Sequence, residues 1–501
     1  MSAGPVQEIL ARLRQAGVVP QGIGADSRTL APGEVFAAWP GFRTDGRRHI
    51  ADAIARGAGA VLWESGDGFD PGALPLPSLA VAGLKELAGP LADEIYDRPS
   101  AALWVAGVTG TNGKTTVSQM LAGALSGLGA RCGIIGTLGC GFPDALEAAL
   151  NTTPDALELQ RWLARFRAGG AVAAAMEVSS IGLDQGRVNG VRFDLAIFTN
   201  LSRDHLDYHG SMDAYGESKA RLFAIPGVDT CVINIDDPFG MMLARRLAGE
   251  GRDVIACTLR ADHAGAVAGA RVLLADRLQA GPAGLRFMLH WDHCEADLAV
   301  PVVAPFNVAN LLAVGAALLA RGVAFETVAS QLVHLTPPAG RMQVVGGGRE
   351  PLVVIDYAHS PDALAKVLEA LRGTVRMRGG RLVCVFGCGG DRDAGKRALM
   401  GEVARTLADR IVITSDNPRS EDPLAIIAAI AAGSGAQAEQ VVDRAQAIRI
   451  AVGEAGAADV VLIAGKGHEP YQEILGQRLP FSDLEQARLA LQAWHAEGRK
   501  Q

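Results

Sequence analysis

A glycine-rich stretch, Gly107-Val108-Thr109-Gly110-Thr111-Asn112-Gly113-Lys114-Thr115-Thr116, constrains the fold of this chain more than any other feature. It follows an apolar run at residues 101–105 and precedes an apolar-periodic run at residues 117–125. This order predicts a strand, a loop and the start of a helix. Such glycines let backbone N–H groups approach phosphate oxygens, and the helix start adds partial positive charge. The stretch therefore predicts a nucleotide-binding α/β domain.

Two side chains of this loop would contact the nucleotide. Lys114 would reach the outer phosphates, and the hydroxyl of Thr115 would bind a magnesium ion. The glycine spacing departs from the common pattern, because the glycines before Gly113 are Gly110 and Gly107 and neither stands five residues back. The alternative is a tight strand-to-helix turn that binds nothing. We favour a variant nucleotide loop.

The length and composition predict an enzyme of several domains. At 501 residues the chain is long enough for about three domains. Apolar residues make up 49% of it, but the longest uninterrupted apolar stretches, at residues 311–320 and 424–433, are too short to cross a bilayer. The N-terminus carries Glu8, Arg12 and Arg14 and lacks a signal-peptide core. We therefore expect a soluble, cytoplasmic protein without a membrane span.

The cysteines and the net charge exclude some classes of protein. Seven cysteines without a C-x-x-C pair argue against a disulfide framework or a zinc ribbon. The cluster His290-Trp291-Asp292-His293-Cys294 could bind a metal, but we favour an alternating strand with a polar face, because no second ligand pair lies at metal spacing. The net charge of -7 gives no general attraction for nucleic acid, so we expect no nucleic-acid partner.

The chain divides into three predicted α/β domains. Residues 1–96 form a small domain with a strand at 35–39, a helix at 49–56 and polar loops at 26–28 and 41–46, which taken alone indicate ordinary turns. Residues 97–337 form the central mononucleotide-binding domain built on the glycine loop. Residues 338–501 follow a Pro337-Pro338-Ala339-Gly340 linker and alternate strand and helix, which predicts a Rossmann-like, doubly wound sheet.

The central domain places polar side chains after its predicted strands. Residues 151–155 read as the start of a helix at 156–167, and a strand at 171–176 delivers Glu177, a possible magnesium ligand. A strand at 193–198 leads to Asp204 and His205, and a helix at 215–223 carries Lys219 towards the same region. The alternatives are a surface glutamate, a loop histidine and a solvated lysine.

In the C-terminal domain, four apolar strands end in polar loops. The strands are predicted at 353–355, 382–386, 411–413 and 460–463. Their loops contain Asp356-Tyr357-Ala358-His359, Gly389-Gly390-Asp391-Arg392, Asp416-Asn417-Pro418-Arg419 and Gly465-Lys466-Gly467-His468-Glu469. Because the carboxyl ends of parallel strands form the ligand crevice of an open α/β sheet, we expect these loops to converge.

Together these motifs resemble the Mur ligase family over nearly the whole chain. The motifs that carry the resemblance are residues 109–116, Asn151-Thr152-Thr153, Glu177-Val178-Ser179-Ser180, Asp204-His205-Leu206-Asp207, Lys219, Gly340-Arg341 and the C-terminal loops 356–359, 416–419 and 465–469. The glycine spacing is this family's form of the loop. Two places depart from the pattern: Ile181 stands where a histidine often follows the serines, and Phe42-Arg43-Thr44 differs in the N-terminal domain.

The resemblance implies an ATP- and Mg²⁺-dependent ligase of cell-wall peptidoglycan synthesis, and hence a part in cell shape and division. Its substrates would be ATP, UDP-MurNAc-L-Ala-D-Glu and meso-2,6-diaminopimelate, and it would act as a monomer. The D-glutamate side-chain carboxylate would attack the γ-phosphate, and the amine of the third amino acid would then displace phosphate from the acyl phosphate. Such chemistry requires neutralised anions, which suits Mg²⁺ and Lys114.

The resemblance also implies roles for individual residues. Lys114, Glu177, His205 and Lys219 would be catalytic, and the magnesium ligands would be Thr115, Glu177, His205 and Lys219, the last as a carbamate (N6-carboxylysine). ATP would bind Gly110, Thr111, Asn112, Gly113, Lys114, Thr115, Thr116, Asn310, Arg341 and Asp356. The UDP-linked dipeptide would bind Ala25, Ser27, Phe42, Arg43, Thr44, Asn151, Thr152, Thr153, Ser179, Gln185 and Arg187. Diaminopimelate would bind Arg392, Asp416, Asn417, Pro418, Arg419, Gly465 and Glu469.

Arg419 favours diaminopimelate over L-lysine as the added amino acid. Its planar guanidinium suits the far carboxylate that lysine lacks, and a lysine-adding enzyme would leave Arg419 unpaired. Asp416 and Glu469 would take the ammonium beside that carboxylate. The alternatives are a lysine-adding ligase, another amide ligase such as a folylpolyglutamate synthetase, a small-molecule kinase, or a non-catalytic nucleotide-binding regulator.

Overall fold

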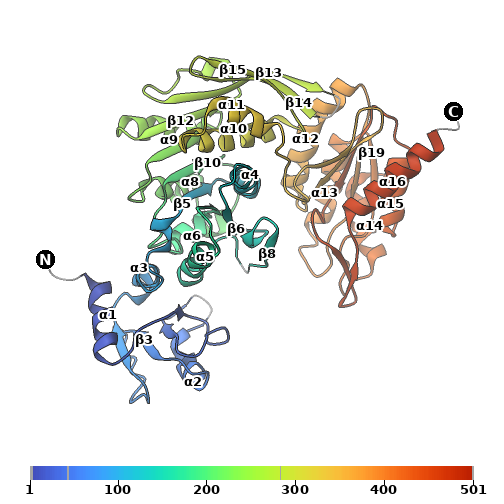
Figure 1. Cartoon of the computed structure of the whole chain (residues 1–501). Helices are drawn as coiled ribbons and strands as arrows, with labels where there is room; N and C mark the ends of the chain where they lie inside the picture. The colour runs from blue at the N-terminus through green and yellow to red at the C-terminus, as the bar shows by residue number, and fades with distance from the viewer. Residues whose placement is uncertain (1–3, 42–43, 150, 282–283, 499–501) are drawn as a thin grey trace. The chain divides into compact units, whose positions relative to one another are not determined.

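The computed structural model describes residues 4–41, 44–149, 151–281 and 284–498, which form two compact units. The first comprises Met1–Cys257, Gly265–Arg271 and Ala316–Gly322. The second comprises Thr258–Ala264, Val272–Gly315 and Val323–Gln501. Helices and strands alternate along the chain, which confirms the predicted α/β class (Figure 1). The domain boundaries after residues 96 and 337 stay a prediction.

The first unit opens with a parallel sheet in the order β1-β2-β3-β4. Leu13 of α1 and Leu91 of α3 are buried in a core with Val35 of β2, whereas Ile50 of α2 packs in a second core with Phe36. Alternate residues of β2 thus belong to two cores, as the two-residue period of a strand requires. The elements of this part are α1 (Pro5–Gln15), β1 (Ile23–Gly24), β2 (Val35–Ala38), η1 (Gly46–His49), α2 (Ile50–Ala55), β3 (Ala60–Glu64), β4 (Ser78–Val81) and α3 (Leu84–Ile95).

The rest of the first unit contains the strands around the glycine loop, in the order β12-β11-β10-β5-β9-β6-β7-β8. The strands from β12 to β6 are parallel, whereas β7 and β8 are antiparallel additions at the edge. The elements are η2 (Pro99–Ala102), β5 (Trp104–Thr109), α4 (Lys114–Gly127), β6 (Cys132–Gly136), β7 (Gly139–Phe142), β8 (Ala145–Glu147), α5 (Ala156–Ala168), β9 (Ala173–Glu177), α6 (Ser180–Asp184), β10 (Leu195–Phe198), α7 (Leu206–His209), α8 (Met212–Ala220), η3 (Arg221–Ala224), β11 (Thr230–Asn234), α9 (Pro238–Gly249) and β12 (Asp253–Thr258).

Local sequence explains where these elements begin. Asp155 caps α5 by accepting hydrogen bonds from the N–H groups of Leu157 and Glu158, as the helix-start signal predicts. The strands β9 and β10 are buried along their whole length, which is typical of parallel strands covered on both faces. Because β5 pairs with both of them, the loops that follow the three strands leave the same edge of the sheet.

The second unit begins with an antiparallel meander and two helices. Its elements here are η4 (Ala261–His263), β13 (Arg271–Gly281), β14 (Gly284–Trp291), β15 (Cys294–Val300), α10 (Pro305–Ala320) and α11 (Phe325–Leu332). The single alternating strand expected at residues 290–294 is wrong. Trp291 pairs with Cys294 across a two-residue turn, in which Asp292 has a φ of 51°. Asp292 tolerates the left-handed conformation that such a hairpin turn requires, and this ends the strand.

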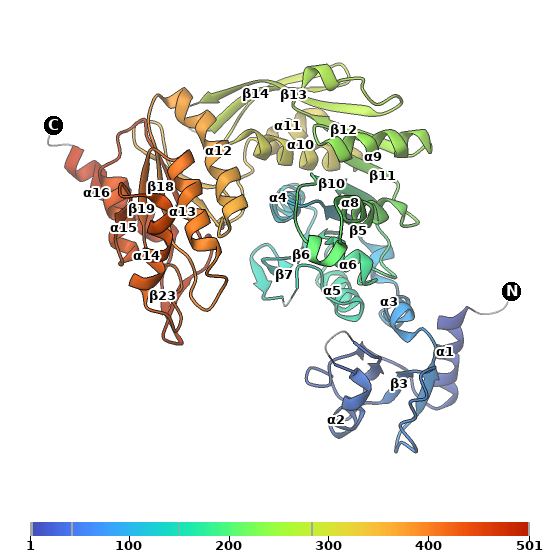
Figure 2. The ribbon, with the colours of Figure 1, turned by 180° about the vertical axis from the view of Figure 1, so that it is seen from behind.

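The C-terminal sheet has the order β16-β17-β21-β18-β19-β20 and is parallel from β17 to β20. The helices α12, α13 and α14 pack on one face and α15 and α16 on the other, which confirms the doubly wound arrangement (Figure 2). The elements are β16 (Gln343–Gly346), β17 (Leu352–Asp356), α12 (Pro361–Arg378), β18 (Leu382–Phe386), α13 (Lys396–Leu407), β19 (Arg410–Ile413), α14 (Pro423–Ser434), β20 (Glu439–Gln440), α15 (Arg444–Gly453), β21 (Val460–Ala464), β22 (Tyr471–Ile474), β23 (Gln477–Pro480) and α16 (Asp483–Gly498).

The buried carboxyl group of Asp93, in α3, lowers the stability of the folded protein when it is ionised. The Oδ1 atom of Asp93 is buried and has no hydrogen-bond partner among the residues that the structure describes. Desolvation, together with the neighbouring charge of Glu94, raises the pKa of Asp93 to about 6. The folded state therefore holds this proton more tightly than the unfolded state does. The contribution of Asp93 to stability is fully present below pH 4 and is lost as the pH rises through 6.

We expect Asp93→Asn to remove this pH dependence. Relative to the wild type, the variant should gain about 1 kcal/mol of unfolding free energy between pH 4 and pH 7, a value reduced for solvent screening. Urea unfolding followed by tryptophan fluorescence at both pH values measures the difference. The exposed Asp144→Asn serves as the control. An equal pH slope in the Asp93 variant and the wild type would contradict the prediction.

Candidate active site

The glycine loop joins β5 to α4 in a shape that only glycine allows at two positions. Gly110 has a φ of 147°, and a Cβ atom there would lie 1.9 Å from Oγ1 of Thr199. Gly113 has a φ of 87° and directly precedes α4. The loop therefore presents its backbone at the start of a 14-residue helix, where N–H groups and the helix dipole attract anions.

Residues after the neighbouring strand β10 brace this loop. The N–H of Thr111 donates to the carbonyl of Asn200 (2.8 Å), and the N–H of Asn112 donates to Oδ1 of Asn200 (3.0 Å). The hydroxyl of Thr199 donates to the carbonyl of Asn112 (2.6 Å). The sequence analysis gave Thr199 and Asn200 no role. Their position after a strand was visible, but the pairing of β10 with β5 was not.

Two lysines donate to the same carbonyl of the loop. Nζ of Lys114 lies 2.8 Å from the oxygen of Gly110 and 2.9 Å from that of Thr111. Nζ of Lys219 lies 2.9 Å from the oxygen of Gly110. Lys219 therefore lies beside the glycine loop and is not the solvated charge of the alternative interpretation.

Burial changes the protonation behaviour of the Lys219 amine. Its side chain is 1% exposed, and its ammonium lies 4.2 Å from the centre of the Tyr215 ring. Desolvation, and then the positive charge of Lys114, lowers the pKa of Lys219 to about 6. Near neutral pH much of Lys219 is then an uncharged amine, which is the nucleophilic form.

Glu177 lies buried at the end of β9, directly against the start of α4. Its Oε2 atom accepts a hydrogen bond from the hydroxyl of Thr115 (3.0 Å), and its Oε1 atom accepts one from the N–H of Thr137 (2.7 Å). Burial raises the pKa of Glu177, and the charge of Lys114 and these hydrogen bonds oppose that rise. Thr137 directly follows β6, and its role could not be predicted from the sequence, because the pairing of β6 with β9 does not show in residue spacing.

His205 stands apart from this cluster. Its side chain is exposed, its φ is 51°, and Nε2 lies 3.7 Å from a carboxylate oxygen of Asp204. Its ring centre lies 6.1 Å from that of Tyr215, whose hydroxyl is 3.3 Å from Oγ1 of Thr111. Within the described residues, His205 has no hydrogen bond to Glu177 or Lys219.

The side chains around Glu177 have the oxygen donors that magnesium prefers. Within the described ranges, no three His, Cys, Asp or Glu side chains gather as a metal site. A magnesium site here would therefore combine the buried carboxylate of Glu177 with the hydroxyl of Thr115 and with ligands outside those four residue types. The carboxylate oxygens of Glu177 and the hydroxyl oxygen of Thr115 are thus suitable ligands for such an ion.

Four residues predicted to hold the sugar and peptide form a connected group. The hydroxyl of Thr153 donates to Oγ of Ser179 (3.1 Å), and Ser179 caps α6. Arg187 donates to the carbonyl of Thr153 (2.8 Å) and through Nη2 to Oε1 of Gln185 (2.7 Å). Thr152 is 3.1 Å from the hydroxyl of Thr137, which ties this group to Glu177.

The residues predicted for the uridine end lie in the N-terminal sheet region. Ser27 is buried, and Ala25 packs against the core around α1 and α3. Thr44 accepts a hydrogen bond from the N–H of Gly41 through its carbonyl (2.9 Å). Phe42 and Arg43 lie outside the described residues.

Three further residues predicted to bind ATP belong to the second unit. Nδ2 of Asn310 donates to Oδ1 of Asn307 (3.2 Å). Asp356 is buried and accepts hydrogen bonds from the N–H groups of Met342 (2.8 Å) and Ala358 (2.9 Å). The Nε atom of Arg341 is buried without a hydrogen-bond partner among the described residues. A cationic group with a buried, unused donor atom suits an anionic ligand.

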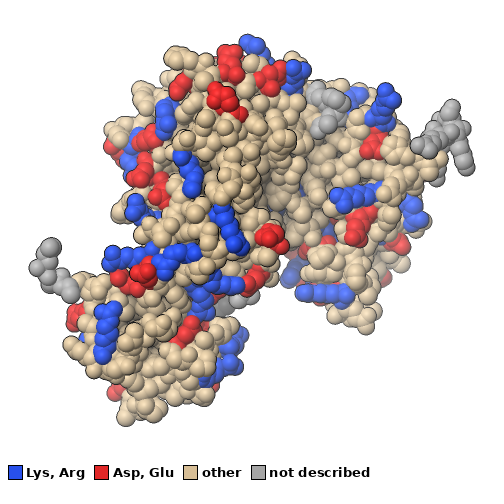
Figure 3. All heavy atoms as spheres, viewed as in Figure 1, with Lys and Arg blue, Asp and Glu red and all other residues tan. Residues whose placement is uncertain are grey.

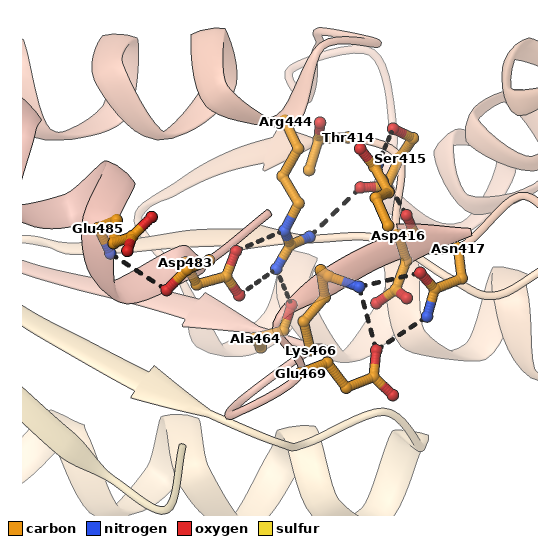
Figure 4. A network of polar contacts seen from close by, with 12 residues as sticks. Thr414, Ser415, Asp416, Asn417, Arg444, Ala464, Lys466, Glu469, Asp483 and Glu485 are labelled. Carbon is orange, nitrogen blue, oxygen red and sulfur yellow. Dashed lines mark hydrogen bonds and ion pairs between the residues drawn. The ribbon is translucent and has the colours of Figure 1, made fainter. Parts of the chain in front are cut away.

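The loops after β17, β18, β19 and β21 leave one edge of the C-terminal sheet, as predicted. A Cβ atom at Gly465 would lie 2.4 Å from Oδ2 of Asp416, and one at Gly389 would lie 2.9 Å from Nη1 of Arg419. Asn417 and Glu469 are joined by a hydrogen bond of 2.8 Å (Figure 4). The loops that carry the predicted amino-acid-binding residues therefore meet, with Pro418 buried and Arg392 exposed.

Arg419 is not unpaired in this structure, and this corrects one step of the specificity argument. Its Nε atom lies 3.3 Å from a carboxylate oxygen of Glu473, and Nη1 donates to the carbonyl of Gly390 (2.8 Å). Glu473 belongs to β22, which bonds back to the Arg419 backbone and brings this acid close. Within the described residues, Nη2 of Arg419 has no hydrogen-bond partner, so one corner of the guanidinium is open to a ligand.

On the face seen in Figure 3, acidic and basic side chains are interspersed. Among the described residues, no helix is both long enough and apolar enough to cross a membrane.

Comparisons with known proteins cover nearly the whole chain. Residues 20–85 match the description "Mur ligase family, catalytic domain", residues 108–318 "Mur ligase middle domain" and residues 340–467 "Mur ligase, glutamate ligase domain". The chain is 52% identical to the UDP-N-acetylmuramoyl-L-alanyl-D-glutamate–2,6-diaminopimelate ligase of Pseudomonas aeruginosa, over 94% of each chain. It is also 52% identical to the ligase of the same name from Ectopseudomonas mendocina, over 96% of this chain and 97% of that one.

A solved structure of a ligase with the same name is similar along its length. It aligns with a TM-score of 0.71 and 36% sequence identity, covering 95% of both chains. The glycine loop, Glu177 beside Thr115, and the doubly wound C-terminal sheet thus occur in a chain that matches one family over most of its length. This chain belongs to the Mur ligase family.

Proposed function

We propose that the chain is an ATP-dependent ligase that joins meso-2,6-diaminopimelate to the D-glutamate side-chain carboxylate of UDP-MurNAc-L-Ala-D-Glu. The observation that carries this proposal is the identity of 52% along 94% of the chain with a relative named for that activity. Because the reaction makes a precursor of peptidoglycan, we also propose that the enzyme acts in the cytoplasm and has a part in cell shape and division. We also propose that it acts as a monomer with domains at residues 1–96, 97–337 and 338–501.

The chemistry explains why a nucleotide loop is needed for amide synthesis. A carboxylate is a poor electrophile, so its oxygen first attacks the γ-phosphorus of ATP and ADP leaves. The amine of the added amino acid then attacks the carbonyl carbon of the acyl phosphate, and phosphate leaves as the amine loses a proton. The first step brings two anions together and the second releases an anionic phosphate, and Lys114 beside the glycine loop supports both by offsetting negative charge.

We propose that ATP binds residues 110–116 together with Asn310, Arg341 and Asp356. Arg341 would contact the γ-phosphate, a role supported by its buried Nε atom, which has no hydrogen-bond partner in the described part of the chain. Asn310 would contact the adenine and Asp356 the ribose. One magnesium ion would be held by Thr115 and Glu177, and a second by Glu177, His205 and the carbamate of Lys219. When bound, the ions would neutralise phosphate charge.

A carbamate on Lys219 would make that side chain a metal ligand. An ammonium repels a cation, whereas a carbamate offers the hard oxygen that magnesium prefers. Carbamate formation requires an uncharged amine, in which the nitrogen attacks the carbon of CO₂ and a proton is lost. The burial of Lys219 and its lowered pKa support this modification.

We propose that the linked group at Thr153, Ser179, Gln185 and Arg187 holds the sugar and peptide, together with Asn151 and Thr152. This group reaches Glu177 through Thr137, so a bound peptide carboxylate would lie near the proposed metal ligands. Ala25, Ser27 and Thr44, with Phe42 and Arg43, would contact the uridine end.

For the added amino acid we propose Arg392, Asp416, Asn417, Pro418, Arg419, Gly465 and Glu469. The open Nη2 corner of Arg419 suits the far carboxylate of diaminopimelate. The carboxylate of Asp416 is 7% exposed and has no hydrogen-bond partner among the described residues, so it suits the far ammonium. The ammonium of L-lysine would pair with Asp416, but L-lysine has no far carboxylate to accept a hydrogen bond from Nη2 of Arg419.

One assay separates the proposed activity from its alternatives. The purified chain is incubated with UDP-MurNAc-L-Ala-D-Glu, ATP and Mg²⁺, with meso-diaminopimelate or L-lysine in parallel, and products are identified by mass spectrometry. The proposal expects an amide with diaminopimelate and little with lysine. A phosphorylated product without an amide would identify a kinase, and preference for lysine would identify the other ligase.

A further inference from the structure

One buried ammonium joins the two loops proposed to hold the added amino acid. Lys466 has no exposed surface, and its Nζ atom donates to Oδ1 of Asn417 (2.9 Å) and to Oε2 of Glu469 (3.0 Å). Nδ2 of Asn417 donates to the same oxygen of Glu469 (Figure 4). The N–H of Glu473 also donates to Oδ1 of Asn417 (2.9 Å). The three side chains form a closed triangle that fixes the orientation of the Asn417 amide.

The bases of the same loops are fixed separately. Arg444 is fully buried, and its guanidinium pairs with Asp483 through two hydrogen bonds of 2.7 and 2.8 Å. It also donates to the carbonyls of Ala464 (3.0 Å) and Ser415 (3.4 Å), the residues directly before the two loops. Arg444 thus bonds to the residues just before the two loops, whereas the Lys466 ammonium bonds to Asn417 and Glu469 within them (Figure 4).

Lys466 also completes a balance of charge around the proposed pocket. Lys466 is paired with Glu469, and Arg419 with Glu473. The remaining charged members of the proposed set are Arg392 and Asp416. Counted as the proposed amino-acid-binding residues and their ion-pair partners, the charged side chains are Arg392, Arg419 and Lys466, matched by Asp416, Glu469 and Glu473. Without Lys466 this set would carry one net negative charge.

We propose that Lys466 is a positioning residue that makes the ligase select a net-neutral amino-acid side chain. This inference rests on the proposed function. The far end of diaminopimelate carries one ammonium and one carboxylate, whereas that of L-lysine carries a single positive charge. By cancelling the charge of Glu469, Lys466 removes the attraction that an anionic pocket would have for lysine. By holding Asn417 and Glu469 together, it keeps the loops in the arrangement that receives diaminopimelate.

Competition between the two amino acids tests this role. Wild type and Lys466→Met are each given ATP, UDP-MurNAc-L-Ala-D-Glu, diaminopimelate and excess L-lysine, and the two products are quantified by mass spectrometry. The ratio of products gives the ratio of the two kcat/KM values. We expect Lys466→Met to lower the preference for diaminopimelate by about tenfold, with the KM for ATP unchanged. Lys366→Met removes an exposed, paired lysine of α12 and should leave the ratio unchanged.

Two more variants separate charge from packing. Lys466→Gln repeats the loss of charge with a polar side chain and serves if the methionine variant does not fold. Lys466→Arg keeps the charge and should keep the preference. Equal losses of both products in Lys466→Met and Lys466→Gln, or a changed preference in Lys466→Arg, would overturn the inference. A wild type that joins neither amino acid would instead overturn the proposed function.

Discussion

Replacing Lys219 by alanine should reduce amide synthesis by about 10²- to 10³-fold, the loss typical of removing a group that stabilises charge in the reaction. Adding formate or acetate should restore part of the activity, because a small carboxylate can enter the space left by the carbamate and offer the same oxygen. The measurement is the initial rate of ADP-coupled amide formation at rising formate concentration. The control is Lys85→Ala, which removes an exposed lysine of α3. Its rate should equal that of the wild type and should not change when formate is added.

Thermal unfolding of the Lys219 variant separates a chemical role from a structural one. Lys219 donates a buried hydrogen bond to Gly110, so some loss of stability is expected in any case. A folded variant with wild-type turnover would contradict the carbamate role. A folded, inactive variant that formate does not rescue would assign Lys219 to the support of the glycine loop.

Replacing Arg419 by alanine should mainly weaken the use of diaminopimelate. We expect kcat/KM for this substrate to fall by an amount that corresponds to a loss of about 2–5 kcal/mol of transition-state stabilisation. The far carboxylate loses its partner and Glu473 is left unpaired. Arg419→Lys should recover only part of this loss, because an ammonium cannot replace the planar guanidinium. Steady-state kinetics with each substrate varied in turn measures the effect. The KM values for ATP and the UDP-linked dipeptide should stay near those of the wild type.

The matched control for Arg419 is Arg405→Ala, which removes an exposed arginine of α13 that pairs with Glu402. It should leave all three KM values unchanged. An unchanged KM for diaminopimelate in Arg419→Ala would count against the proposed pocket. Equal changes in all three KM values would indicate a general disturbance of the C-terminal sheet.

Much of the fold could be predicted, because apolar runs and turn residues are local signals. The strand at 382–386 and the loops at the carboxyl ends of the C-terminal strands were predicted directly from the sequence. The error at residues 290–294 arose because a hairpin with a two-residue turn keeps the alternation of a single strand. Only the left-handed backbone at Asp292 distinguishes the two, and alternation does not report it.

The partners within the candidate site were harder to predict, because they depend on which strands are neighbours. Thr137 reaches Glu177 from 40 residues away, and Glu473 reaches Arg419 through β22. Lys466 was visible in its motif, but its burial and its contacts with Asn417 and Glu469 follow from the meeting of two loops. The residue types predicted the kind of chemistry. Which charged side chains pair with each other could be seen only in the folded structure.

The central claim is that the D-glutamate carboxylate is activated by phosphorylation. Its most direct test uses UDP-MurNAc-L-Ala-D-Glu labelled with ¹⁸O in the glutamate side-chain carboxylate, with ATP, Mg²⁺ and diaminopimelate. Because the attacking oxygen stays with phosphorus when the amine displaces phosphate, the account predicts one ¹⁸O atom in each inorganic phosphate released, measured by mass spectrometry. Amide formed with unlabelled phosphate would contradict the acyl-phosphate pathway, and phosphate labelled from ¹⁸O-water would indicate simple ATP hydrolysis.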